Sequence, residues 1–390
     1  MSTAKATRSA KGGGTIRKRS DGRREARYSV GFDPKTGKQI QKSIYGKTQK
    51  EVRQKLAKVT TELDEGTYLE PVKDTLAEWL DTWLSTYVAY SVKPYTLASY
   101  QGTCERHIKP ALGRIKLSNL TAPQIQRFYN ELLTEKKLSP KTVKNVHGVL
   151  HKALEQAVKL DMIRFNPTES CDLPKSSRKE IKPMEQEDIT NFLQAICGNK
   201  YEAVYRVTLF TGMREGEVLG LTWDCVDFER NTIFVNKQLQ KTTKVGGIYT
   251  LAPTKNGRSR VITVAPSVME VLKQQKSQQL QMQLLAGEMW DNPWNLVFTN
   301  EMGGHLCHFT VYKHFKNIVK EMGLESKRFH DLRHSYAVAA IESGDDIKTV
   351  QSNLGHATAS FTLDVYGHVS QKMKQQSADR MEAFIQGVSR

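Results

Sequence analysis

Five side chains in the second half of the sequence are of types that act on phosphate esters, and they stand in short motifs. Arg214 follows Thr-Gly-Met at an expected helix start, and His330 and Arg333 lie three residues apart, on one helical face. His356 follows Leu-Gly, and Tyr366 comes ten residues later. Arginine binds phosphate bidentately, histidine transfers protons near neutral pH, and a tyrosine hydroxyl can be a nucleophile. These types together suit cleavage of a phosphodiester bond.

The order and spacing of these motifs resemble those of the tyrosine recombinases, also called lambda-type phage integrases. The matching pieces are Thr-Gly-x-Arg-x-x-Glu at Arg214, His-x-x-Arg at His330, Leu-Gly-His ending at His356, and Tyr366. Each motif is weak alone, whereas their order and spacing together are specific. The likeness spans nearly the whole chain. Residues 74–168 look like the family's core-binding domain, and the first 66 residues look like the arm-binding domain of conjugative-transposon and phage integrases.

The resemblance implies a mechanism whose charge balance agrees with these residue types. Arg214 and Arg333 would neutralise the non-bridging oxygens of the scissile phosphate in the transition state. Tyr366 would be the nucleophile and would form a 3′-phosphotyrosyl bond with DNA. None of these steps needs a metal or other cofactor. Because this bond conserves the energy of the phosphodiester, no ATP is expected either, and the sequence holds no Walker motif.

Proton transfer is assigned through the same resemblance. Lys255 matches the family's hairpin lysine and would protonate the leaving 5′ oxygen as general acid, with Lys241 and Lys244 as rivals on the same hairpin system. His330 is the candidate general base or acid, since an unperturbed imidazole has a pKa of about 6.5. His356 would donate a hydrogen bond to the scissile phosphate.

Two histidine pairs raise a metal site as an alternative. His330 and His334 have a zinc-binding i, i+4 spacing, but Asp331 stands where the HExxH motif has glutamate. His305 and His308 have no matching second pair nearby. We therefore expect no metal, and a strand-to-helix turn at 305–308.

Positive charge is concentrated near the N-terminus. The 390 residues carry +17, from 58 Lys and Arg against 41 Asp and Glu, whereas residues 1–58 alone hold 17 basic and four acidic residues, or +13. A folded basic module favours nucleic-acid binding over a solubilising tail. The expected DNA contacts lie in this module, in the linker 169–182 and on the hairpin: Arg17, Lys18, Arg19, Arg23, Arg24, Arg27, Lys175, Arg178, Lys179, Lys182, Arg258 and Arg260.

Periodicity predicts a small β-sheet with one helix, followed by a helical bundle. Strands are expected at 15–19, 26–32 and 39–45, and a helix from Thr48, with Glu51 completing a capping box, to Gly66. The bundle helices are expected at 76–87, 94–109, 122–136 and 140–160, with N-caps at Thr121 and Ser139. Its tryptophans and tyrosines are interpreted as core residues.

The region from Pro183 is expected to mix helices with a few strands. The helices are predicted at 185–197, 199–211, 215–221, 266–286, 308–322, 330–343, 346–354 and 370–386. The strands are predicted at 232–239, 248–252 and 259–264, the last two joined by a turn at 253–257. The fold class is thus multidomain: a three-stranded β-sheet plus helix, an all-α core-binding bundle, and a mainly-α catalytic domain with a small antiparallel sheet. The boundaries are a disordered basic tail 1–13, an arm-type DNA-binding domain 14–66, the bundle 74–168, the linker 169–182, and the catalytic domain 183–390.

The resemblance implies a site-specific recombinase of a mobile element, which integrates and excises DNA as a homotetramer on two double-stranded sites. The helix after Tyr366 would dock on a neighbouring protomer, and an excisionase or a host DNA-bending protein would be a further partner. A type IB-like topoisomerase and a catalytically silent DNA-binding regulator are the alternatives. Five scattered cysteines, no run of 18 apolar residues and a polar N-terminus favour a cytoplasmic protein without a membrane contact.

Overall fold

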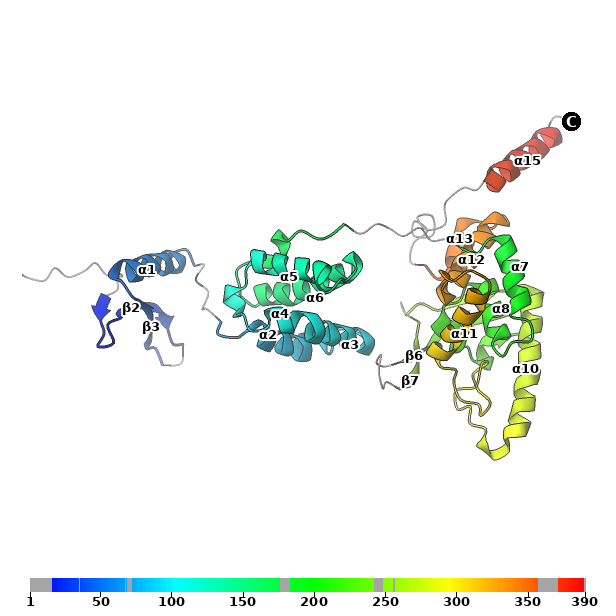
Figure 1. Cartoon of the computed structure of the whole chain (residues 1–390), viewed down its shortest axis with the longest axis horizontal. Coiled ribbons are helices and arrows are strands. Elements are labelled where there is room, and N and C mark those ends of the chain that lie inside the picture. The colour runs from blue at the N-terminus through cyan, green and yellow to red at the C-terminus, as the bar shows by residue number, and fades with distance from the viewer. Residues whose placement is uncertain are drawn as a thin grey trace, which may run out of the picture. The chain divides into compact units, whose positions relative to one another are not determined.

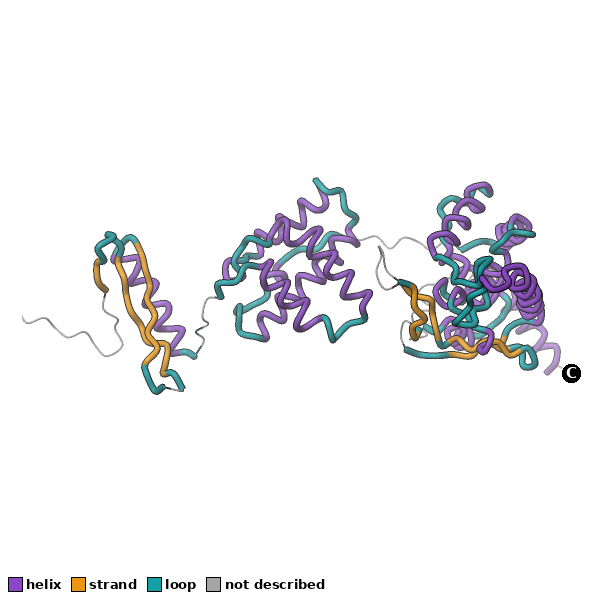
Figure 2. Tube along the Cα trace, turned by 90° about the horizontal axis from the view of Figure 1, so that it is seen from below, coloured by secondary structure: helices purple, strands orange, loops and turns teal. Residues whose placement is uncertain are grey.

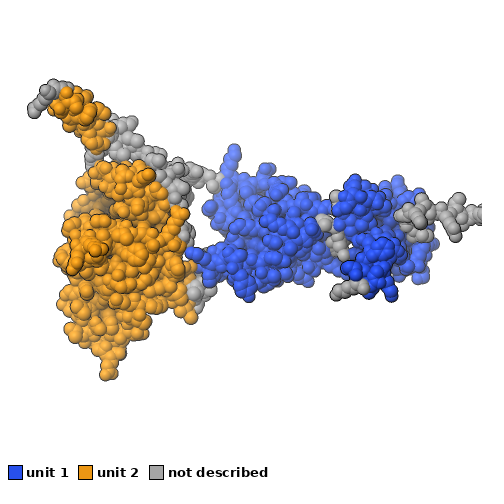
Figure 3. All heavy atoms as spheres, turned by 180° about the vertical axis from the view of Figure 1, so that it is seen from behind, with its two compact units in different colours: residues 1–176 blue, residues 177–390 orange. Residues whose placement is uncertain are grey.

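The computed structural model describes residues 16–34, 36–66, 68, 72–175, 183–241, 248–254, 257–356 and 371–388. The chain divides into two compact units, residues 1–176 and 177–390 (Figure 3). The expected tail 1–13 and the linker residues 176–182 lie outside the described residues. Among the helices of the described residues, none is long and apolar enough to cross a membrane.

Unit 1 begins with an antiparallel sheet in the order β1 (Ile16–Lys18), β2 (Arg24–Phe32), β3 (Gln39–Gly46), followed by α1 (Gln49–Asp64). The Thr48 side chain caps α1 by accepting from the Glu51 amide, as expected. α1 lies along one face of the sheet (Figures 1 and 2), where Val52 and Leu56 pack with Ala26. The predicted sheet-plus-helix module is therefore present.

The rest of unit 1 is a bundle of α2 (Leu76–Thr82), α3 (Pro94–Thr103), α4 (Lys109–Leu112), α5 (Ala122–Thr134) and α6 (Pro140–Lys159). The capping residues of α5 and α6 are those expected. The helix predicted over 94–109 is interrupted by a π-helical turn (Cys104–Ile108), because Pro110 cannot donate to the carbonyl one turn back. A second π-helical turn (Trp83–Val88) follows α2. Two short 3₁₀ turns (Leu117–Asn119 and Pro167–Ser170) complete the bundle.

The aromatic residues of the bundle divide into two groups. Trp79 and Tyr129 are buried, and the Trp79 indole N–H donates to the Ala153 carbonyl at 2.9 Å, which confirms their place in the core. Tyr87, Tyr90 and Tyr95 are 37%, 94% and 39% exposed, so the interpretation of the bundle's tryptophans and tyrosines as core residues was wrong at these three positions.

The described residues of unit 2 form mainly helices, with two small antiparallel sheets. Its helices are α7 (Gln186–Ala195), α8 (Glu202–Thr211), α9 (Glu215–Leu219), α10 (Pro266–Ala286), α11 (His308–Glu321), α12 (Phe329–Glu342), α13 (Ile347–Leu354) and α15 (Gln371–Val388). Its strands are β4 (Val226–Asp227), β5 (Thr232–Val235), β6 (Lys237–Lys241), β7 (Tyr249–Pro253) and β8 (Arg260–Thr263). Two 3₁₀ turns (Trp223–Cys225 and Gly287–Met289) connect them.

The strands of unit 2 pair differently from the sequence prediction. The single strand expected at 232–239 is two strands, because β5 pairs with β8 in the sheet β4-β5-β8 whereas β6 pairs with β7. β7 and β8 accordingly do not form a hairpin with each other. Gly220 permits this arrangement, since a Cβ there would lie 2.4 Å from the backbone nitrogen of Leu239 in β6. β6 can therefore pack directly against α9.

Candidate active site

Arg333 on α12 ties together the ends of two other helices. Its side chain is almost fully buried at 1% exposure. One terminal guanidinium nitrogen (Nη1) donates to the Gly212 carbonyl, and the other (Nη2) donates to the Leu354 carbonyl, each at 2.6 Å. These carbonyls lie at the C-termini of α8 and α13. Because helix C-termini carry unsatisfied carbonyls and partial negative charge, a buried guanidinium is well placed there.

Both helix ends turn through a glycine in the left-handed conformation, Gly212 at φ 64° and Gly355 at φ 63°. A Cβ at Gly212 would also lie 2.4 Å from the Tyr336 ring. Glycine is therefore required both by backbone angle and by space at Gly212. The turns bring the residues that follow them, Arg214 and His356, to the same side of α12.

Arg214 caps α9 and is held by the carboxylate of Glu217. Its Nη1 donates to Glu217 Oε1 at 2.7 Å, and its backbone N–H donates to Glu217 Oε2 at 2.9 Å. The other terminal nitrogen (Nη2) points to the Gly355 carbonyl at 3.4 Å. The Arg214 side chain keeps 24% exposure, so its guanidinium remains accessible to an anion.

Glu217 also forms an ion pair with Arg260 of β8, and this pairing was not predicted from the sequence. Arg260 donates to both carboxylate oxygens, at 3.2 and 2.7 Å, and to the Asn353 carbonyl at 2.6 Å. Burial by itself would raise the pKa of Glu217, but the hydrogen bonds and charge of Arg260, with the charge of Arg214, lower it to about 2. Arg260, expected to contact DNA, is thus placed in a buried ion pair with only 8% of its side chain exposed.

The two candidate catalytic histidines lie beside the arginines and are held neutral. The pKa of His330 is lowered to about 4 by the removal of water from part of its ring, by the neighbouring His334, and by the charges of Arg333 and Arg214. The His334 ring meets the His330 ring edge-on, with centroids 4.8 Å apart. Burial and the same two arginines lower the pKa of His356 to about 3. Neutral imidazoles can accept a proton, and a bound phosphate would raise both pKa values.

The structure thus brings together four of the six expected catalytic residues: Arg214, His330, Arg333 and His356. Lys255 and Tyr366 lie outside the described residues, as does the rival Lys244. The other rival, Lys241, lies over the Tyr249 ring, with 5.8 Å from its Nζ to the centroid.

The remaining histidine motif packs around a tyrosine. His308 stacks on the Tyr249 ring, with centroids 5.5 Å apart, and His305 lies 4.5 Å from it on another side. Cys307 is the N-cap of α11, so the expected strand-to-helix turn is confirmed. Within the described part of the chain, no group of three or more His, Cys, Asp or Glu side chains is arranged to hold a metal ion.

The predicted DNA contacts occupy several environments. Arg17, Arg19 and Arg27 are exposed and lie near the Glu25 carboxylate, whereas Arg23 pairs with Asp21 at 2.8 Å. Lys18, Lys175 and Arg258 are exposed, Arg24 is half-buried, and Arg178, Lys179 and Lys182 lie outside the described residues.

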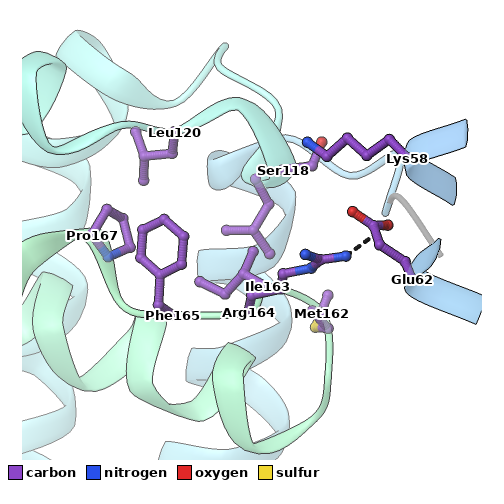
Figure 4. A pocket seen from close by; sticks show the side chains of 10 residues that line it. Lys58, Glu62, Ser118, Leu120, Met162, Ile163, Arg164, Phe165 and Pro167 are labelled. Atoms are coloured by element: carbon purple, nitrogen blue, oxygen red, sulfur yellow. Dashed lines mark ion pairs between the residues drawn. The ribbon is translucent and has the colours of Figure 1, made fainter. Parts of the chain in front are cut away.

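A cavity of about 400 Å³ in unit 1 lies apart from these residues (Figure 4). Glu62 of α1 and Arg164 form an ion pair of 2.6 Å at its edge. None of the side chains predicted to act on DNA lines this cavity, so its position gives no support for a role in the reaction.

Comparison with known proteins agrees with this geometry. Residues 182–373 match the phage integrase family, and residues 75–133 match the N-terminal SAM-like domain of phage integrases. A XerC-like tyrosine recombinase of Caldanaerobacter subterraneus subsp. tengcongensis is 31% identical over 375 residues, which cover 92% of this chain and 95% of the relative. The chain belongs to the phage integrase family. It is a tyrosine recombinase, an enzyme that cuts and rejoins DNA.

Solved structures confirm the predicted fold. A Tn1549 transposon integrase in complex with circular intermediate DNA aligns with a TM-score of 0.67 at 21% identity, over 79% of this chain and 99% of that one. A lambda integrase tetramer bound to a Holliday junction aligns with a TM-score of 0.55 at 20% identity, over 88% and 96%.

Proposed function

We propose that the chain is the integrase of a mobile genetic element, acting on duplex DNA with Arg214 and Arg333 at the scissile phosphate. The observation that carries the assignment is the position of the buried Arg333, whose two hydrogen bonds fix the helix ends from which Arg214 and His356 extend. Two guanidinium groups and two neutral imidazoles meet at one place, where they can bind a phosphate and stabilise the charge of its transition state. The transposon origin of the Tn1549 relative supports the mobile-element role.

In this proposal the Tyr366 hydroxyl attacks the phosphorus, and the 5′ oxygen of the next nucleotide leaves. His330 is neutral before DNA binds and accepts the tyrosine proton, while Lys255 gives a proton to the leaving oxygen. His356 donates to a non-bridging oxygen. Rejoining is the reverse reaction with a different 5′ hydroxyl, so the number of phosphodiester bonds is conserved.

The test is capture of the covalent intermediate on a nicked duplex from the element's junction, in EDTA and without ATP. The wild-type chain is expected to form a protein–DNA adduct with a free 5′ hydroxyl, which polynucleotide kinase labels directly. Tyr366→Phe should abolish the adduct, and Tyr312→Phe, at an exposed tyrosine of α11, should keep it. An adduct that persists in Tyr366→Phe would refute the assigned nucleophile.

The two alternatives make different predictions. A type IB-like topoisomerase would relax supercoiled plasmid that lacks any recombination site. A silent DNA-binding regulator would bind the junction without forming an adduct. The lambda tetramer favours assembly on DNA, and the N-terminal basic module favours a second class of binding site on the element's arms.

Assembly is proposed to use α15. Its described exposed apolar side chains, Met381, Phe384, Ile385 and Val388, recur at i, i+3, i+4 and i+7 and form one stripe. We propose that this stripe docks on a neighbouring protomer. Truncation after Gly367 should keep binding to a single site and remove cooperative assembly on paired sites, measured by gel shift. Unchanged cooperativity in the truncated chain would contradict the docking role.

A further inference from the structure

Glu25 is an acidic residue in the middle of the basic N-terminal sheet. It lies on β2, the central strand, where Ala26 and Tyr28 face α1. Because side chains alternate along a strand, Glu25 and Arg27 face the opposite side of the sheet. Glu25 is nevertheless only 2% exposed, since the basic side chains around it cover its carboxylate.

The neighbours of Glu25 come from all three strands or their ends. Arg17, directly opposite on β1, donates to Oε2 from Nε at 2.8 Å and from Nη2 at 2.7 Å. Arg27 lies 3.4 Å from Oε1, and Arg19 lies 3.7 Å from Oε2. The Ser43 hydroxyl on β3 donates to Oε1 at 2.8 Å. Hydrogen bonds from Ser43 and Arg17, with the charge of Arg17, lower the pKa of Glu25 to about 2.

This arrangement holds Arg17 through two N–H groups and Arg27 through one, and leaves both side chains accessible. The side chains of Arg17, Arg19 and Arg27 keep 56%, 40% and 54% exposure. A free arginine explores many rotamers and meets phosphate anywhere along a duplex, whereas a guanidinium held on two N–H groups presents its others in a set direction. Direct reading of guanine needs that direction, because the two acceptors on its major-groove edge must be met together.

We propose that Glu25 is a positioning residue that sets the register of Arg17 and Arg27 on the open sheet face and thereby the base sequence that this face selects. The inference deepens the proposed function and rests on the N-terminal module binding DNA. Glu25 itself contributes no attraction to DNA. Its negative charge weakens non-specific binding, so its removal separates affinity from sequence preference.

The experiment selects DNA from a random duplex library with the full-length chain and compares Glu25→Gln with wild type. Glu65→Gln, at the exposed C-terminal end of α1, is the matched control because it makes the same change of charge away from the sheet face. The wild type is expected to enrich two motifs, one for each DNA-binding region. In Glu25→Gln, the first motif, bound outside the N-terminal module, should be unchanged and serve as internal control. The second motif, bound by the N-terminal sheet, should become degenerate.

The size of the effect is measured by competition. The ratio of specific to non-specific affinity for the second motif should fall by about tenfold in Glu25→Gln, the loss expected for one misdirected bidentate contact. Non-specific affinity should stay equal or rise, because the net charge increases by one. A residue needed only for folding would instead lower binding to both kinds of DNA in parallel.

Ser43→Ala provides a second variant should Glu25→Gln unfold the module, as judged by circular dichroism. It removes one hydrogen bond to Glu25 without a change of charge, and a smaller fall of the same ratio is expected. A second motif and ratio identical to wild type in a folded variant would overturn the role of Glu25. A wild-type chain that enriches a single motif would overturn the DNA-binding role of the module, and the Glu25 proposal with it.

Discussion

Replacing Glu215 by glutamine tests the energetics of the site most directly. Glu215 is the first residue of α9 and follows Arg214. Its Oε1 is the buried side-chain oxygen without a hydrogen-bond partner among the described residues. Burial raises the pKa of Glu215 to about 7. A carboxyl with one buried oxygen that lacks a hydrogen-bond partner is costly to ionise, so the folded chain keeps the neutral form into the neutral range.

The direction in which stability changes with pH follows from the two pKa values of Glu215, 4.5 without burial and about 7 in the folded chain. Between them the unfolded chain has lost the Glu215 proton while the folded chain retains it, so the free energy of unfolding falls as pH rises. At about 1.4 kcal/mol per pKa unit, the full loss is ~3 kcal/mol, of which about 2 kcal/mol falls between pH 5.5 and pH 8. Glutamine stays neutral throughout and lacks this loss.

The assay is urea unfolding of the full-length chain at pH 5.5 and pH 8, followed by tryptophan fluorescence. The stability difference between Glu215→Gln and wild type should move in favour of the variant by about 2 kcal/mol at the higher pH. Glu288→Gln, at an exposed carboxylate, controls for the loss of one charge and should show no such change. A difference that is the same at both pH values would refute the raised pKa of Glu215.

Three further substitutions test how the site is held. Arg333→Lys should lower adduct formation at least about 100-fold and cost ~2 kcal/mol in thermal unfolding, since one ammonium group cannot bridge both helix ends. Gly212→Ala should lower the free energy of unfolding by ~2 kcal/mol, because the new Cβ would lie 2.4 Å from Tyr336. Gly198→Ala should lower it less, because a Cβ there has no atom within 4 Å. Glu217 has its pKa lowered to about 2, so wild type should lose stability as pH falls from 4.5 towards 2, and Glu217→Gln should be less stable at pH 7 and lack this acid dependence.

Local signals in the sequence predicted most helix boundaries. Pro140 and Pro266 stand at the first turns of α6 and α10, and Gly355 ends α13, because these residue types favour those positions whatever lies around them. The strand pairing depends on contacts far apart in the chain, which explains why one expected strand proved to be two. A run of strand-forming residues does not reveal where its partner changes.

The same limit applies to the site. The motifs predicted that Arg214 and Arg333 act together, and spacing placed His330 beside Arg333. They could not distinguish Arg260 from Arg258, two basic residues on one segment. The structure separates them by burial, since Arg260 reaches Glu217 across 43 positions of the chain whereas Arg258 is exposed. Pairing of this kind has no signature in the local sequence.

Glu25 and Glu217 have the same kind of environment, a buried carboxylate bound to arginines. Each is a buried carboxylate between arginines of separate elements. The pKa of Glu25 is lowered to about 2 by hydrogen bonds from Ser43 and Arg17, and that of Glu217 is lowered to about 2 by Arg260 and Arg214. A carboxylate behind a guanidinium reduces the local positive charge and fixes the direction of the remaining N–H groups. Its replacement by glutamine should therefore leave non-specific affinity for DNA equal or raise it at either place, while selection of sequence falls at Glu25 and the cleavage rate falls at Glu217. The net charge of +17 attracts the chain to DNA, whereas the carboxylates of Glu25 and Glu217 set the direction of the arginine N–H groups once DNA is bound.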